Sequence, residues 1–256
     1  MQILVCVKQV PDSESVIEIA ASGEWIAEEG LVFRMNRFDE YAVEEALVIR
    51  DAFPGSTVTA LTVGPRRAES TARRAMEMGA DRGVRIPLET DGYASPMAVA
   101  SLIAAHARGE GYDLILCGAM AEDDMQAQVG PLLAEMLDIP SATSVIAAAV
   151  SGDAAIRVER EMEGGAREAM ELSLPALVAV QPGINRPRYP SLSNVLRAKS
   201  QAIPEESPSP GAGGLAFERL ARLRLPERSS TCELITGSAA EKAEKLLAIL
   251  ATRSLL

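Results

Sequence analysis

The sequence predicts an α/β fold: a mainly parallel β-sheet with helices between its strands, appended antiparallel strands, and a C-terminal tail. In the first half of the chain, short apolar runs rich in β-branched residues alternate with longer segments of helical period, which is typical of strand–helix–strand units. Between residues 144 and 180 the runs are short and separated by glycine turns, which favours antiparallel strands. Residues 204–214 are rich in Pro, Ser and Gly, as linkers are. We therefore expect one domain over residues 1–203, and a linker and tail over residues 204–256.

The first expected strand covers residues 2–7 and leads into a longer connection before the first helix. Asp39 is placed as the N-cap of that helix, which should end near Asp51. Phe38 and Val43 have the spacing of a hydrophobic staple around this cap. The apolar stripe of the helix should contact the sheet.

Later elements are marked by turn and cap residues. Further strands are expected at residues 57–63, 84–86 and 113–117. A helix rich in Ala and Arg should end at Gly79, because glycine adopts a left-handed conformation easily. Ser95 followed by proline should begin the next helix. In the tail, Ser238 and Glu241 have the spacing of a capping box, which predicts a terminal helix. Its apolar stripe would consist of Ala243, Leu246, Leu247 and Leu250.

Composition excludes several classes of function. With 25 basic and 36 acidic residues, the formal net charge is −11, so we expect no nucleic acid partner. Cys6, Cys117 and Cys232 are widely separated and are expected to be reduced thiols. Residues 1–10 become polar too early to span a bilayer and lack a basic leader, which predicts a soluble, cytoplasmic protein. His106 has no second metal ligand at usable spacing, so we expect no metal site and a helix residue that is solvated or hydrogen-bonded.

Candidate chemistry lies in the loops after Val7, Val63 and Cys117, because ligands of parallel sheets bind beyond the carboxyl ends of the strands. The loop at residues 118–131 contains two glycines and leads into a helix, whose unpaired N–H groups attract phosphate. Its acidic residues, at positions 122–124, compete with an anion and equally suit simple helix capping. From the residues alone, nucleotide binding and capping both remain open.

A series of motifs resembles one known family. The segments are VKQVPD (7–12), MNRFDEYAVEEAL (35–47), TVGP (62–65), AMEMGADRG (75–83), GAMAEDDMQAQVGP (118–131) and RPRYPSLSNVLRAKS (186–200). They resemble, in family order and at matching intervals, the signature blocks of electron transfer flavoprotein beta subunits. The resemblance covers about the first 200 residues, and the tail matches only loosely.

This resemblance implies a sheet of the adenine-nucleotide-binding, Rossmann-like type with a structural AMP, while the redox FAD lies mainly in an alpha subunit. Carried over by position, the residues near the adenosine would be Cys6, Val7, Asn36, Asp39 and Val63. The backbone at Gly118 would allow close approach, and the phosphate would meet Asp123, Met125, Gln126, Ala127, Gln128 and Val129. Many relatives carry a small hydroxyl or amide residue and an extra acid where residues 125–127 stand, so backbone contacts to the phosphate are expected here. Phe38 corresponds to an aromatic residue that reaches the flavin ring of the partner.

The resemblance also implies a recognition loop at residues 184–200. Its docking residues would be Arg186, Arg188, Tyr189, Leu192, Asn194 and Lys199, with Leu192 anchored in a hydrophobic pocket of an acyl-CoA dehydrogenase. Composition alone favours an ordinary surface turn followed by a helix. The implied role is a non-enzymatic electron carrier of fatty acid β-oxidation. It would pair with the alpha subunit, accept electrons from acyl-CoA dehydrogenase-type flavoenzymes and pass them towards a membrane quinone reductase.

Two other interpretations stay open. A flavin-bifurcating beta subunit would hold a second FAD in place of AMP, although the blocks at residues 37–47 and 189–199 look more like those of simple carriers. A stand-alone nucleotide-binding stress-type domain, or an ATP-using enzyme of the same fold, would form a homo-oligomer without flavin. The adjacent acids Glu44 and Glu45 suggest an acid–base pair, but neighbours on a helix point in different directions, so we expect one of them to be solvated.

Overall fold

The computed structural model describes residues 1–88, 92–152, 154–207, 218, 220–226, 232 and 234–255. It divides into two compact units, Met1–Leu223 and Arg224–Leu256. The division lies later than the boundary expected at residue 203. Part of the reason is that the backbone of Arg85, in an edge strand, bonds to the backbone of Pro204 and Glu206.

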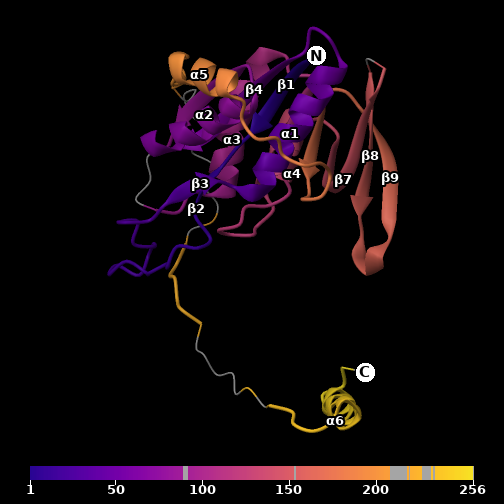
Figure 1. The fold of residues 1–256 in the computed structure, drawn as a ribbon. Helices are drawn as coiled ribbons and strands as arrows, with labels where there is room; N and C mark the ends of the chain where they lie inside the picture. Colours follow the sequence, from indigo (N-terminus) through magenta and orange to yellow (C-terminus); the bar gives the residue numbers. More distant parts are fainter. Residues whose placement is uncertain are drawn as a thin grey trace. The chain divides into compact units, whose positions relative to one another are not determined.

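The first unit is built on an eight-stranded sheet (Figure 1). Its strands, from one edge to the other, are β5 (Arg82–Pro87), β4 (Thr57–Gly64), β1 (Gln2–Cys6), β6 (Leu114–Gly118), β10 (Ala176–Val180), β7 (Ser141–Ser151), β8 (Ala155–Glu161) and β9 (Arg167–Ser173). Every pair from β5 to β7 is parallel, whereas β8 and β9 are antiparallel to their neighbours. The predicted fold class, a parallel sheet with appended antiparallel strands, is confirmed.

The order of the strands places a topological switch point beside β1. From β1 the chain continues to β4 and β5 on one side, and it then returns to form β6 on the other side. Connections therefore leave the carboxyl ends of β1 and β6 in opposite directions. Such a switch point is where open α/β sheets bind ligands.

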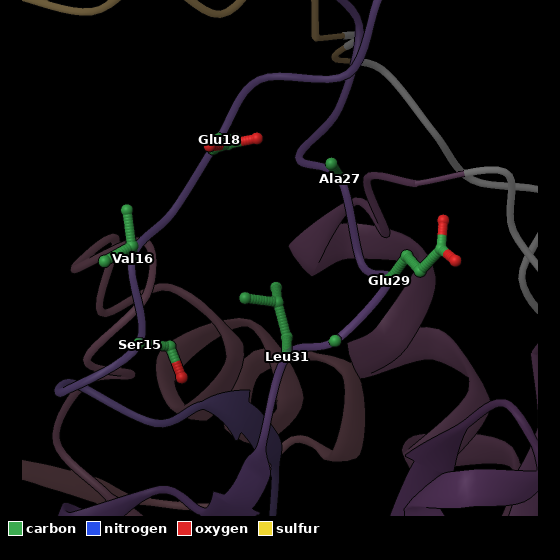
Figure 2. A pocket seen from close by; sticks show the side chains of 7 residues that line it. Ser15, Val16, Glu18, Ala27, Glu29 and Leu31 are labelled. Atoms are coloured by element: carbon green, nitrogen blue, oxygen red, sulfur yellow. The ribbon is translucent and has the colours of Figure 1, made fainter.

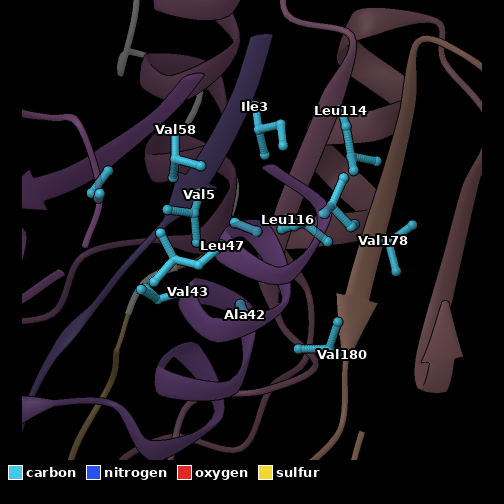
Figure 3. Packing of buried hydrophobic residues seen from close by; sticks show 14 of the residues in the cluster. Ile3, Val5, Ala42, Val43, Leu47, Val58, Leu114, Leu116, Val178 and Val180 are labelled. Carbon is cyan, nitrogen blue, oxygen red and sulfur yellow. The ribbon is translucent and has the colours of Figure 1, made fainter. Parts of the chain in front are cut away.

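Helices cover the two faces of the parallel part. They are α1 (Arg37–Ala52), α2 (Glu69–Met78), α3 (Pro96–Glu110) and α4 (Val129–Leu137). A further helix, α5 (Leu192–Ser200), packs against α2. Alternate side chains of β1 separate into two cores: Ile3 and Val5 pack with α1, while Leu4 and Cys6 pack with residues of α3 and α4. Figure 3 shows the first core, where Val43 and Leu47 of α1 lie against the strands. Burying each such side chain contributes about 1.5–3 kcal/mol.

Two of the predicted helix signals are confirmed. Gly79 follows α2 with a φ of 140° and ends the helix. Ser95 accepts a hydrogen bond from the backbone N–H of Ala98, and Pro96 is the first residue of α3.

The predicted cap of α1 is wrong. The helix begins at Arg37, with Asn36 as its N-cap, so Asp39 lies inside the first turn. Phe38 is likewise a helix residue, and no staple around Asp39 can form. The carboxylate of Asp39 is instead turned into the protein, where it accepts hydrogen bonds at the ends of β1 and β6.

The expectation of antiparallel strands throughout residues 144–180 is correct for β8 and β9 but wrong for β10. This strand lies between β6 and β7 and is parallel to both. All of its residues are buried. A continuous apolar run is typical of a central parallel strand, which has helices or other cover on both faces.

Short elements complete the first unit. They are the ribbon of β2 (Gln9–Pro11) and β3 (Phe33–Met35), and the single 3₁₀ turns η1 (Arg66–Ala68) and η2 (Glu163–Gly165). His106 is buried in α3 and bonds through its ring nitrogens to Glu206 and Tyr112, at 2.6 and 3.1 Å. It is therefore a hydrogen-bonded helix residue.

The second unit contains α6 (Ala239–Thr252). Its capping box is confirmed, because Ser238 and Glu241 bond to each other's backbone N–H groups. Leu246 and Leu247 are about half exposed within this unit. Of the predicted linker, residues 208–214 lie outside the described part. Among the helices that the structure describes, none is long and apolar enough to cross a membrane.

Candidate functional site

Asp39 joins the ends of β1 and β6, the two strands at the switch point. One carboxylate oxygen accepts the backbone N–H of Lys8, which follows β1, at 2.7 Å. The other accepts the backbone N–H of Gly118, at the end of β6, at 3.0 Å. Asp39 is 5% exposed. Helix α1 thus fixes the separation of the strand ends at the point where a ligand is expected.

Gly118 is required by this close packing. A Cβ atom at this position would lie 2.5 Å from a carboxylate oxygen of Asp39 and 2.6 Å from the Cβ of Phe38. Real Cβ atoms do not approach so closely. The structure therefore explains the glycine through contact with α1, whereas the resemblance implied close approach of a nucleotide.

The amide of Asn36 holds the loop that follows β6. It donates to the carbonyl oxygen of Met120 at 2.9 Å and accepts the backbone N–H of Glu122 at 3.1 Å. Asn36 is 1% exposed. The side chains of Asn36 and Asp39, both expected near the adenosine, are thus occupied in organising the strand ends.

The acidic residues of the loop are each paired with a cation. Lys8 lies 2.7 Å from Asp123 and 2.9 Å from Asp124. Burial alone would lower the pKa of Lys8, but these two carboxylates outweigh it and raise the pKa. Arg34 lies 3.3 Å from Glu122. Because the acids are compensated locally, their repulsion of an incoming phosphate is reduced.

Unpaired backbone donors follow these acids. Among the described residues, none accepts a hydrogen bond from the backbone N–H groups of Ala127, Gln128, Val129 or Gly130. Helix α4 begins at Val129 without a side-chain cap and without an acidic residue in its first turn. Met125 and Ala127 have φ values of 53° and 54°, which are unusual for residues other than glycine. This arrangement of N–H groups at a helix start can bind an anion through the backbone.

The remaining predicted cofactor residues lie at the ends of β1 and β4 and at the start of α1. Cys6 and Val7 are buried at the end of β1, where the N–H of Val7 donates to the carbonyl of Leu61 at 2.8 Å. Val63 is partly buried near the end of β4, and Phe38 is partly buried. The structure therefore brings the ends of β1, β4 and β6 together, as the sequence predicted.

Sequence reasoning missed two aromatic residues near the loop. Tyr93 exchanges hydrogen bonds with the side chain of Gln126, with oxygen–nitrogen and oxygen–oxygen distances of 3.2 and 3.4 Å. Its ring lies 6.4 Å from that of Trp25. No motif signals this contact, because the three residues come from distant segments. The only sequence signal for the pairing of Lys8 with Asp123 and Asp124 was its position in the motif at residues 7–12.

A separate hollow of about 350 Å³ lies in the N-terminal segment (Figure 2). It is lined by Ser15, Val16, Glu18, Ala27, Glu29, Gly30 and Leu31, and none of the predicted site residues takes part. Its two carboxylates would repel a phosphate. We therefore consider the switch point at the strand ends to be the better candidate site.

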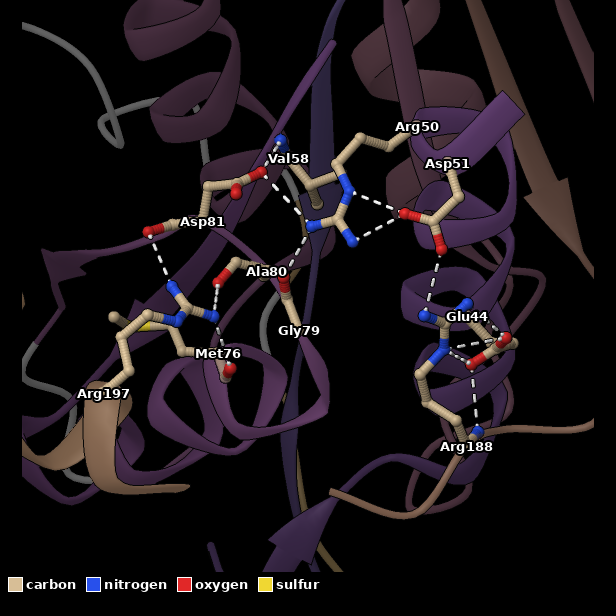
Figure 4. A network of polar contacts seen from close by, with 10 residues as sticks. All are labelled: Glu44, Arg50, Asp51, Val58, Met76, Gly79, Ala80, Asp81, Arg188 and Arg197. Carbon is tan, nitrogen blue, oxygen red and sulfur yellow. Dashed lines mark hydrogen bonds and ion pairs between the residues drawn. The ribbon is translucent and has the colours of Figure 1, made fainter. Parts of the chain in front are cut away.

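The loop at residues 184–191, which was expected to dock a partner, is held against α1 by Arg188. Its guanidinium binds both oxygens of Glu44, at 2.9–3.1 Å, and Asp51 at 3.1 Å (Figure 4). Its backbone N–H also donates to Glu44, at 2.9 Å. Asn185 donates to Glu45 at 2.9 Å. The expectation that one of the two adjacent acids is solvated is wrong, because each is only 5% exposed.

Arg188→Gln should lower the free energy of unfolding by about 2 kcal/mol, because the buried carboxylate of Glu44 loses its charged partner. Arg186→Gln is the matched control, since Arg186 is exposed in the same loop, and it should change stability by less than about 0.5 kcal/mol. Urea unfolding of both variants measures the difference. Equal effects would show that the ion pair does not stabilise the loop.

Apolar side chains are exposed at the end of this loop and at the start of α5. Tyr189 is 95% exposed and Leu192 is 75% exposed. Ser191 caps α5 by accepting the N–H of Asn194 at 3.2 Å, and Arg197 ties the helix to the carbonyl oxygens of Met76 and Ala80. Lys199 is also exposed. A rigid base thus presents a small apolar surface.

No metal centre is evident in this arrangement. Within the described ranges, no group of three or more His, Cys, Asp or Glu side chains could hold a metal ion. The site therefore offers backbone N–H donors for an anion and apolar strand ends for an uncharged ring.

Comparison with known proteins gives a consistent result. A family model described as "Electron transfer flavoprotein domain" matches residues 24–210. The chain is 34% identical over 261 residues to "Electron transfer flavoprotein subunit beta" of Bacillus subtilis (strain 168), covering 98% of this chain and 97% of that protein. The Homo sapiens protein of the same name is 34% identical over 251 residues, covering 97% and 96%. A Bradyrhizobium diazoefficiens protein of that name is 36% identical over 207 residues, covering 81% and 82%.

Proposed function

Because this chain belongs to the electron transfer flavoprotein family as a beta subunit, we propose that it binds AMP at the ends of β1, β4 and β6. We further propose that it pairs with a flavin-bearing alpha subunit and docks flavin dehydrogenases through residues 184–200. Its role is then that of an electron carrier subunit without an enzymatic reaction of its own.

The unpaired N–H groups at residues 127–130 carry the proposal of AMP binding. Four consecutive donors at a helix start suit the phosphate of a nucleotide. The loop acids do not oppose it, since Lys8 and Arg34 compensate them. The adenosine would lie along Cys6, Val7 and Val63. Asn36 and Asp39 then act by holding the loop and strand ends that shape the site.

The flavin face is assigned to the start of α1. Phe38 is partly buried beside Gly118 and belongs to the same turn as Asp39, so its position is fixed by the clamp on the strand ends. An aromatic side chain there would give the flavin ring a planar apolar contact and exclude water from it. FAD itself supplies the redox chemistry and would be held mainly by the alpha subunit.

The exposed loop surface is assigned to docking. Leu192 and Tyr189 provide an apolar anchor on a rigid base, which suits capture by a hydrophobic pocket. Acyl-CoA dehydrogenase-type flavoenzymes are the proposed donors, and a membrane quinone reductase is the proposed acceptor. Arg188, although expected to dock, is proposed to orient the loop, because its guanidinium is bound by Glu44 and Asp51.

Helix α6 is assigned to the alpha subunit. Its described residues include none that is buried, although Leu246 and Leu247 form an apolar stripe. A helix of this kind gains stability when the stripe packs against another surface.

Removing AMP from the purified protein should lower its melting temperature and leave the flavin spectrum in place. Ligand that binds only the folded state stabilises it by about 2.7 kcal/mol when present at 100 times its Kd. Differential scanning calorimetry, with and without added AMP, measures the shift. If the two melting temperatures are equal, AMP has no structural role here.

A further inference from the structure

Two thiols lie side by side beneath the proposed nucleotide site. Val5 of β1 is paired with Leu116 of β6, so the next step along both strands brings Cys6 beside Cys117. Both belong to the same core, on the face covered by α3 and α4, and each is 7% exposed. Neighbouring strands are separated by about 4.8 Å. Disulfides join Cα atoms that are about 4.4–6.8 Å apart, so the backbone spacing allows a bond between them.

The start of α4 covers this pair. A Cβ atom on Gly130 would lie 3.0 Å from the sulfur of Cys117, so the helix backbone packs directly on the thiol. The N–H groups of the same turn are the proposed phosphate donors. Bound nucleotide would therefore hold in place the segment that shields the sulfur.

The covered thiols are unreactive. Burial, then Cys117 and Asp39, hold the pKa of Cys6 well above its usual range. Burial and then Asp39 raise the pKa of Cys117 to about 12. Since the thiolate is the reactive form and both thiols are buried, oxidation requires the pair to become exposed to water.

The loop before α4 contains two unusual backbone conformations. Met125 and Ala127 both have left-handed backbone conformations, which residues other than glycine rarely adopt. Contacts between phosphate and the N–H groups of residues 127–130 would stabilise this conformation in the loaded protein, and these contacts are lost when the nucleotide leaves.

We propose that Cys6 and Cys117 form an oxidisable pair, which hydrogen peroxide converts to a disulfide when the nucleotide site is empty. One sulfur attacks the peroxide, its O–O bond breaks, and one water and a sulfenic acid form. The second sulfur then attacks the first, the S–O bond breaks, and the thiol proton leaves with the hydroxyl group as a second water. Peroxide is reduced and the two thiols are oxidised. This inference rests on the proposed binding of AMP.

The experiment uses the full chain with Cys232→Ser, so that only the two buried thiols remain. One sample is depleted of nucleotide and the other is saturated with AMP, and both are treated with hydrogen peroxide. Thiols are counted after denaturation, and intact mass is measured. The depleted protein should lose both thiols and the mass of two hydrogen atoms. At AMP 100 times above its Kd, the rate should fall by about 100-fold if only the empty form reacts.

Single variants Cys6→Ala and Cys117→Ala test the pairing. Each should gain oxygen instead of losing hydrogen, because no second thiol is present to complete the bond. The proposal is overturned if the depleted protein keeps both thiols, gains only oxygen, or reacts equally fast with AMP bound. A calorimetric titration with AMP shows whether a failure lies in nucleotide binding or in the pairing of the thiols. If AMP does not bind, the proposed function fails, while disulfide formation in the unloaded protein still decides whether the thiols pair.

Discussion

Leu192→Ala should slow reduction of the flavin by an acyl-CoA dehydrogenase by at least about 30-fold, the effect expected when an interface loses an anchor worth 2 kcal/mol or more. Leu192 is 75% exposed at the first position of α5, and the helix is held in place by Arg197. The flavin content should not change, because Leu192 is exposed and is not among the residues proposed to contact a cofactor. Stopped-flow absorbance measures the rate.

Leu225→Ala is the matched control for this prediction. Leu225 is 69% exposed, so its removal deletes a similar area of apolar surface from another segment. Its reduction rate should stay near that of the unmodified protein. If Leu192→Ala and Leu225→Ala behave alike, Leu192 is not the docking anchor.

The second large effect concerns Asp39 and pH. Burial raises the pKa of Asp39 to about 7, against hydrogen bonds from Lys8, Asn36 and Gly118 that lower it. The folded protein therefore binds this proton more tightly than the unfolded chain, whose Asp titrates near pH 3.9. The contribution of Asp39 protonation to the free energy of unfolding is fully present below about pH 4 and is lost as the pH rises to about 7. The loss amounts to at most about 4 kcal/mol, at 1.36 kcal/mol for each pH unit.

Asp39→Asn isolates this contribution, because the amide does not titrate. We expect its free energy of unfolding to decrease less than that of the unmodified protein between about pH 4 and pH 7, since all other groups are shared. Urea unfolding at several pH values provides the comparison. Parallel pH profiles for the two proteins would show that Asp39 has the same affinity for a proton in the folded and unfolded states.

The general location of the site could be predicted from the sequence. In a parallel sheet, carboxyl ends of neighbouring strands meet at one edge, so loops after Val7, Val63 and Cys117 were expected together. The glycines and the following helix indicated backbone contacts with phosphate. These inferences depend on local patterns and on a general property of the topology.

The roles of individual polar side chains could not be predicted in the same way. Asp39 has the properties of a helix cap, but its partners are Lys8, which follows β1, and Gly118, at the end of β6. Glu44 and Glu45 were expected to differ in burial, yet a distant loop supplies a partner for each. Tertiary contacts between remote segments override local preference in both cases.

The direction of β10 illustrates a related limit. The glycine turns in residues 144–180 correctly indicated the β8–β9 hairpin. The same pattern of short segments gave no sign that β10 returns to the centre of the sheet as a parallel strand. Its uninterrupted apolar residues were the available signal, since a strand with one solvated face would alternate.

The central claim is that strand-end loops hold an adenine nucleotide beside a surface that receives the flavin of another subunit. Co-expression of this chain with its alpha subunit, followed by nucleotide extraction and mass measurement, tests both parts together. We expect a yellow heterodimer that contains one AMP and one FAD. Two FAD molecules in each heterodimer would contradict the assignment of AMP, and a chain that carries no nucleotide and binds no flavin-bearing partner would contradict the whole account.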